Sequence, residues 1–236
     1  MADEFLTTRW SVVLAAAAGE SPAAGAAMEQ LCRDAWRPLY AFARRWGCTR
    51  EDAEDAVQGF IASVLARQSL GHLEAGRGRF RSFLLAGMRN HLSDLQARAN
   101  ATKRGGGAVH LSLDTQAAEL GYVSFAADTE SPERTFDRIW AMSILEKARQ
   151  QLGIECEASG KGSVFAALFP DSDAVPTEPY ATLGTRLGLS ESALRSLIMR
   201  LRRRWRDLIR AELSQTVGSR EALDEEMACL QAALQD

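Results

Sequence analysis

The chain has 236 residues, of which 46% are apolar and 25% are charged. This balance is typical of a globular protein and excludes a disordered one. No apolar run approaches the roughly 18 residues of a membrane span, and the acidic start lacks the basic segment of a secretory signal. We therefore expect a cytoplasmic protein.

The net charge of −3 hides a strong segregation of charge along the chain. Residues 77–104 hold seven basic residues and one acid, and residues 186–210 hold eight arginines and two acids. Two basic blocks in a mildly acidic chain indicate two contacts with one polyanion. Two solvated helix faces would give the same pattern, but arginine suits phosphate and base-edge contacts better than it suits general solubility.

The four cysteines match neither a zinc site nor a redox pair, and they are too few for a disulfide framework. They are Cys32, Cys48, Cys156 and Cys229. None of the three histidines stands near a cysteine or carboxylate at ligand spacing. We expect neither a metal nor another cofactor.

Almost every periodic segment of the chain has helical spacing, which predicts an all-α fold. A short helix is expected around Trp10, followed by a loop or weak helix over residues 15–27. Residues 31–46 form an amphipathic segment that Pro38 kinks or restarts and that Gly47 ends.

Thr49 and Asp52 predict a helix start by mutual capping. The following helix has an apolar stripe, and its acidic and amide residues are expected on the opposite face. The stripe comprises Ala53, Val57, Phe60, Ile61 and Val64, and the opposite face comprises Glu51, Asp55, Gln58 and Ala62.

A third helix is expected over residues 80–98, with Phe83, Leu84, Met88, Leu92 and Leu95 facing inward. Three glycines at 105–107 end this domain, and residues 107–130 have the composition of a linker. Ser131, Pro132 and Glu133 form a strong helix start, and the helix continues to about Leu152.

The last third of the chain predicts a helical hairpin and a final acidic helix. Residues 153–176 mix loop signals with one apolar piece at 164–169. Residues 180–187, a tight turn at Gly188, and residues 190–213 have the dimensions of a helix-turn-helix. Residues 219–234 form an amphipathic helix with Leu223, Met227, Leu230 and Leu234 inward.

The helix after Ser190 has the two faces of a recognition helix. Its inner face is apolar, and its first turns present the side chains that such a helix aims at base edges, while the later arginines suit phosphates. The inner residues are Leu194, Leu197, Ile198, Leu201, Trp205, Leu208 and Ile209, and the predicted duplex contacts are Ser192, Arg195, Ser196, Met199, Arg200 and Arg203.

Three ordered motifs resemble the extracytoplasmic-function group of bacterial RNA polymerase sigma factors. The first is Asp52-Ala53-Glu54-Asp55-Ala56-Val57-Gln58, the second is Phe83-Leu84 followed by Arg89-Asn90 and Asp94, and the third is the 180–210 hairpin. The resemblance implies two small helical domains joined by a flexible linker, at residues 29–106 and 131–213. An N-terminal extension (1–28) and an acidic C-terminal helix (214–236) flank them.

The resemblance implies that the first domain binds the −10 promoter element and core polymerase. Its DNA contacts would be Arg79, Arg81, Arg89, Asn90, Asp94, Arg98, Lys103 and Arg104. Its polymerase contacts would be Asp52, Asp55, Gln58 and Ile61, which would dock on the clamp helices of the largest subunit. The second domain would bind the −35 element.

The other implied partners are the flap of the second-largest polymerase subunit and, for some members of the group, an anti-sigma factor. The family motifs leave three segments unassigned, namely Thr8–Trp10, Gly153–Pro176 and the acidic final helix. That final helix either packs as an ordinary amphipathic helix or restrains DNA binding by an arginine-rich helix.

Two other classes of function compete with this interpretation. A stand-alone helix-turn-helix regulator would bind duplex DNA, usually as a symmetric dimer, but it would not need the motifs of the first domain. An enzyme is disfavoured because the sequence has no phosphate-binding glycine loop, no nucleophile elbow and no catalytic His/Cys/carboxylate cluster.

Overall fold

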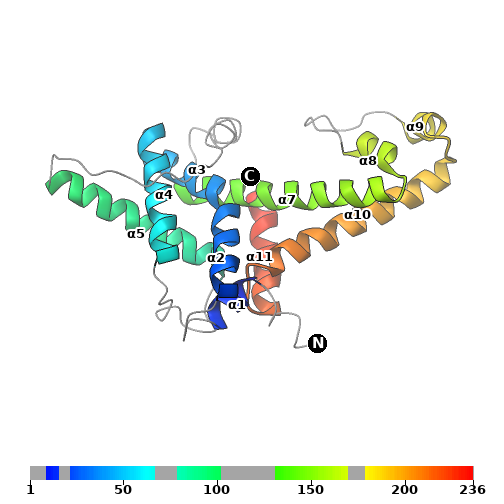
Figure 1. Cartoon of the computed structure of the whole chain (residues 1–236). Helices are drawn as coiled ribbons and strands as arrows, with labels where there is room; N and C mark the ends of the chain where they lie inside the picture. The colour runs from blue at the N-terminus through cyan, green and yellow to red at the C-terminus, as the bar shows by residue number, and fades with distance from the viewer. Residues whose placement is uncertain (1–8, 16–21, 67–78, 102–130, 170–178, 236) are drawn as a thin grey trace. The chain divides into compact units, whose positions relative to one another are not determined.

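The computed structural model describes residues 9–15, 22–66, 79–101, 131–169 and 179–235. Every regular element in these ranges is a helix, as Figure 1 shows. The prediction of an all-α fold is therefore confirmed for the described part of the chain. The predicted linker at 107–130, like Lys103 and Arg104, lies outside these ranges.

Most helices begin and end within a few residues of the predicted positions, but α2 starts at Pro22, within the segment for which a loop or weak helix was expected. In chain order they are α1 (Arg9–Ala15), α2 (Pro22–Asp34), α3 (Trp36–Trp46), α4 (Arg50–Ala66), α5 (Phe80–Ala101), α7 (Pro132–Ala158), α8 (Gly162–Leu168), α9 (Tyr180–Arg186), α10 (Glu191–Ser214) and α11 (Arg220–Ala233).

The chain divides into two compact units whose boundaries fall inside helices. Unit 1 comprises residues 1–143 and 213–236, and unit 2 comprises residues 144–212. The first part of α7 and the whole of α11 therefore belong with the N-terminal helices. The sequence had grouped residues 131–143 with the C-terminal hairpin instead, and had set 214–236 apart as a separate tail.

Local capping sets the helix ends in unit 1. The predicted 31–46 segment is split at Ala35, because a proline three residues into α3 cannot continue the hydrogen-bond ladder of α2. Gly47 ends α3 with a left-handed φ of 110°. The Asp52 amide donates to Thr49 Oγ1 (3.2 Å), and Thr49 Oγ1 donates to the Asp52 carboxylate (2.7 Å), as predicted.

A chain of aromatic rings forms the centre of the unit 1 core. Phe80 at the start of α5 contacts Trp10 of α1 (centroids 5.2 Å) and Trp140 of α7 (6.3 Å). Trp140 stacks on Phe136 (6.1 Å), which meets Phe42 of α3 edge-on (6.4 Å). This packing holds the first three turns of α7 in unit 1.

Both ends of the chain pack on the start of α5. The Trp10 amide donates to the carbonyl of Gln215 (3.1 Å), and the Phe80 amide donates to the carbonyl of Thr216 (3.0 Å). Arg9 pairs with Asp34 of α2 at 3.0 Å. The described helix α1, which the motifs left unassigned, thus contributes Trp10 and Val13 to the unit 1 core.

Two leucines expected to face inward are exposed, and one helix is longer than expected. Leu95 of α5 is 38% exposed and Leu234, just after α11, is 42% exposed, because both lie near helix ends where little packs against them. The α7 helix continues past Leu152 to Ala158. Gly153 lies inside α7. A Cβ at this position would lie only 3.0 Å from the Phe165 ring of α8, so a glycine leaves room for that ring.

Candidate nucleic-acid interface

The turn between α9 and α10 depends on two glycines. Gly188 has a φ of +67°, which favours glycine. A Cβ on Gly184 would meet the carbonyl oxygen of Leu189 at 2.8 Å. The Leu189 amide also donates to the Gly184 carbonyl at 2.8 Å, so the two backbone segments touch directly.

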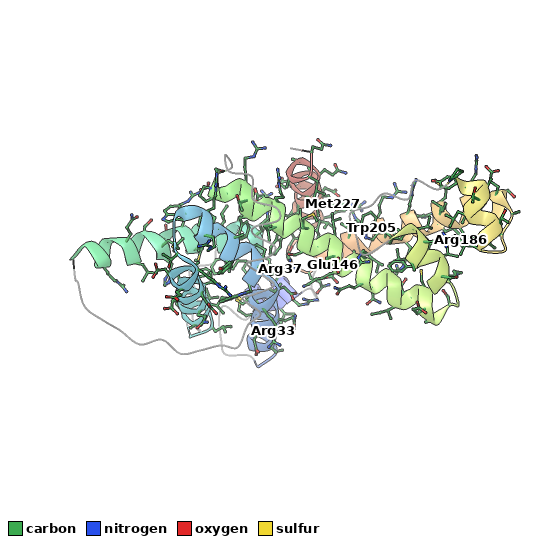
Figure 2. The ribbon with its side chains drawn as sticks, turned by 90° about the horizontal axis from the view of Figure 1, so that it is seen from above. Arg33, Arg37, Glu146, Arg186, Trp205 and Met227 are labelled. Atoms are coloured by element: carbon green, nitrogen blue, oxygen red, sulfur yellow. The ribbon has the colours of Figure 1, made fainter. Side chains whose placement is uncertain are left out.

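Ser190 begins α10 as predicted, and the helix buries its apolar face. The Ser190 hydroxyl accepts a hydrogen bond from the Ala193 amide (3.2 Å). Of the predicted inner residues, Trp205 is half-buried and the other six are buried. Trp205 packs edge-on against Phe169 (centroids 5.7 Å), and Figure 2 labels it on α10.

The opposite face of α10 is exposed over its whole length. All six predicted duplex contacts lie on this exposed side, namely Ser192, Arg195, Ser196, Met199, Arg200 and Arg203. Met199 is an apolar side chain with 61% exposure. Arg195 pairs with Glu191 one turn earlier (2.5 Å) at an exposed site, which is a weak interaction.

One arginine of the second basic block forms an exposed ion pair between two helices of unit 2. Arg204 donates from Nε and Nη2 to the two carboxylate oxygens of Glu155 on α7, at 2.8 and 2.7 Å. The hydrogen bonds and charge of Arg204 lower the pKa of Glu155. This two-point contact links α10 to α7, so Arg204 differs in role from its neighbours.

The arginines at the start of α5 contact carboxylates of other helices. Arg81 Nε donates to both carboxylate oxygens of Glu226 on α11 (3.2 and 2.9 Å), and Arg81 Nη1 pairs with Asp137 of α7. Arg79 pairs with Glu225 at 3.0 Å and with Glu226 at 3.4 Å. These two predicted phosphate contacts are therefore already occupied by acidic side chains.

The two arginine pairs differ in how far their side chains are exposed. The Arg81 side chain is 11% exposed and Glu226 only 1%, whereas Arg79 is 30% exposed and Glu225 62%. Burial alone would lower the pKa of Arg81, but the charges and hydrogen bonds of Glu226 and Asp137 raise it above its ordinary value. Arg81 is thus a permanently charged group at the junction of three helices.

Arg89 is also paired, one step further along the same helix contact. It donates to Glu133 of α7 at 2.5 Å. Burial alone would raise the pKa of Glu133, but hydrogen bonds from its own backbone amide and from Arg89 lower it. Arg81–Asp137 and Arg89–Glu133 are thus two separate ion pairs between α5 and α7.

The remaining predicted −10 contacts within the described ranges are exposed. Asn90, Asp94 and Arg98 all lie at exposed positions of α5. Arg98 also takes part in an interaction within the chain.

The acidic helix α4 presents only half of the predicted polymerase contacts. Asp52 and Asp55 are exposed, whereas Gln58 is 4% and Ile61 is 3% exposed. The outward placement of Gln58 was wrong. Gln58 precedes Ile61 by three residues, which puts both side chains on one side of the helix, and its Oε1 is buried with no hydrogen-bond partner.

Sequence reasoning missed the carboxylates that pair with the α5 arginines. Glu133 and Asp137 stand four residues apart on α7, and Arg81 and Arg89 eight apart on α5. These spacings differ, so they did not indicate which side chains would meet. Nothing local pointed to Glu225 and Glu226, which lie about 145 residues from their partners.

Within the described ranges, no group of three or more His, Cys, Asp or Glu side chains could hold a metal ion. Among the helices that the structure describes, none has the length and apolar character needed to cross a membrane. The thiol of Cys32 is buried, which raises its pKa to about 12. A buried thiol of this kind is a packing residue rather than a nucleophile.

No protein-family model matches the sequence, and no curated protein or solved structure is significantly similar to it.

Proposed function

We propose that this protein is a promoter-recognition subunit that binds core RNA polymerase and contacts duplex DNA through α10. The observation that carries the proposal is the two-faced structure of α10. Its apolar face is packed, and its opposite face presents small polar residues and Met199 first and a dense set of arginines afterwards. Major-groove recognition needs this order of base-edge and phosphate contacts.

The ordered motifs that resemble sigma factors extend the proposal to a second contact. The exposed residues Asn90, Asp94 and Arg98 of α5 would contact the −10 element, and the exposed Asp52 and Asp55 of α4 would contact the polymerase clamp helices. A protein with this role would work in the cytoplasm, beside polymerase and DNA.

Run-off transcription tests the proposal. Purified core polymerase and a genomic promoter pool are incubated with and without the protein, and the transcripts are mapped. We expect new transcripts that start downstream of a shared two-part motif. If no transcripts appear and no complex with core polymerase forms, the proposal is overturned.

Paired arginine variants locate the duplex contact. R200Q/R203Q removes two charges from the exposed face of α10 and should weaken duplex binding. Its matched control, R33Q/R37Q, removes two exposed arginines from α2 and α3, which Figure 2 labels. Loss of two phosphate contacts should reduce the slope of log affinity against log salt by about 1.8, and the control should leave the slope unchanged.

A stand-alone duplex-binding regulator is the second candidate, and one observation favours it. In unit 1, Arg79, Arg81 and Arg89 are paired with carboxylates and Gln58 is buried. This arrangement leaves α10 as the more accessible cationic surface. Duplex binding without core polymerase, combined with no run-off product, would favour this candidate.

A further inference from the structure

The α11 helix places two carboxylates on the first two described arginines of the first basic block. Glu225 contacts Arg79, and Glu226 contacts both Arg79 and Arg81. With Asp137 included, two guanidinium groups face three carboxylates. These five side chains carry more negative than positive charge, which opposes the binding of a nucleic-acid backbone to the two arginines.

We propose that Glu225 and Glu226 compete with nucleic acid for Arg79 and Arg81, so that α11 must move away before this part of α5 can bind a phosphate backbone. The inference rests on the proposed function, because it assumes that α5 is a nucleic-acid surface. It assigns a role to the final helix, for which the sequence motifs provide none.

The contact has an exchangeable outer layer and a buried inner layer. Glu225 is 62% and Arg79 is 30% exposed, so water and salt reach this pair and weaken it. Glu226 and Arg81 lie beneath it at 1% and 11% exposure. A phosphate would therefore displace Glu225 from Arg79 first, and Arg81 would become available only after α11 had separated.

The apolar seam that holds α11 is narrow. Leu223 and Leu230 are buried at 4% and 7% exposure, whereas Met227 is half-buried and Leu234 is 42% exposed. Ion pairs therefore provide a substantial part of the α11 contact. The helix also has its own start signal, because the Ser219 hydroxyl accepts from the Ala222 amide (3.2 Å). This cap stabilises the first turn of α11 independently of its contact with α5.

The test uses the full chain and a fluorescent oligothymidine titrated at several salt concentrations. E225Q/E226Q removes the competing charges, and E221Q is an exposed control on the same helix. Each phosphate contact in a single strand contributes about 0.7 to the salt slope. We expect the double variant to bind several-fold more tightly, with a slope steeper by about 1.4, and E221Q to bind like the unmodified chain.

The R79Q substitution distinguishes competition for Arg79 from a general effect of lost negative charge on oligothymidine affinity. In the unmodified chain, R79Q should leave oligothymidine affinity unchanged, because Arg79 is already paired. In the E225Q/E226Q background, R79Q should lower the affinity several-fold. Equal effects of R79Q in both backgrounds, or no gain of affinity in E225Q/E226Q, would overturn the inference.

Circular dichroism and thermal unfolding establish that each variant is folded. If E225Q/E226Q does not fold, E225Q alone removes the shorter of the two ion pairs of Arg79, while its 3.4 Å contact with Glu226 and the buried Glu226–Arg81 pair are kept. The expected change of slope then becomes at most about 0.7. The proposed function is tested separately by R200Q/R203Q on duplex DNA. Normal α10 effects without any E225Q effect would overturn only the inference, whereas loss of both would overturn the proposed function.

Discussion

At the scale of single residues, Gly184 is a position where only a hydrogen atom fits. Replacing it with alanine would bring a Cβ to 2.8 Å from the Leu189 carbonyl oxygen. Backbone atoms cannot give way as a flexible side chain can, so we expect G184A to destabilise unit 2 by about 1–3 kcal/mol. Urea unfolding measures this change, and duplex binding should weaken with it.

Gly25 provides the matched control for Gly184. It lies in α2 at an exposed position, and a Cβ there would meet nothing within 4 Å. Because alanine is the better helix former, G25A should stabilise the protein by up to about 1 kcal/mol. Destabilisation of similar size in both variants would contradict the close contact at the α9–α10 turn.

At the scale of elements, α11 is attached to α5 by one buried and one exposed ion pair, whose contributions to stability can be compared. E226A would leave Arg81 buried without its main partner, which typically costs about 3–5 kcal/mol. E225A removes an exposed partner and should cost at most about 1 kcal/mol. The two free energies of unfolding, measured in urea, should therefore differ several-fold although the helix and the charge change are the same.

The α5–α7 contact predicts a pH dependence of stability. The pKa of Glu133 is lowered in the folded protein. A lowered carboxyl pKa contributes stability above its unfolded value, and this contribution is lost as the pH falls through the folded value. We therefore expect this contribution to stability to be lost below about pH 4.5, the ordinary glutamate value.

E133Q tests this pH dependence. The variant should lose less stability than the unmodified chain between neutral pH and about pH 3, because glutamine does not titrate. E29Q is a suitable control, since Glu29 forms only an exposed pair with Arg33 within α2. Parallel pH curves for E133Q and the unmodified chain would contradict a stabilising Arg89–Glu133 contact.

At the scale of the whole molecule, helix α1 and the turn at residues 215–219 both support unit 1. Trp10 is fully buried, contacts Phe80 and Phe83, and hydrogen-bonds to Gln215. W10A should destabilise unit 1 by about 3–5 kcal/mol, through a cavity that the aromatic neighbours cannot close. V12A, at a half-buried position of the same helix, should cost clearly less in the same unfolding experiment.

The helices and the two faces of α10 could be predicted from local patterns in the chain. Helix ends at Gly47, Thr49, Ser131 and Ser190 depend on atoms within four residues, so local chemistry suffices to predict them. The exposed and buried sides of α10 follow from a period of 3.6 residues. The candidate duplex contacts, from Ser192 to Arg203, were therefore predictable as an exposed surface.

Only the tertiary structure decided which charged groups meet. Arg81 and Glu226 are 145 residues apart in the chain, and no local pattern brings two such distant groups together. Gln58 is buried because of what packs beside Ile61, which the helical period alone does not specify. Burial and ion pairing depend on the neighbouring helices, and packing of those helices placed α11 and the start of α7 on the arginines of α5.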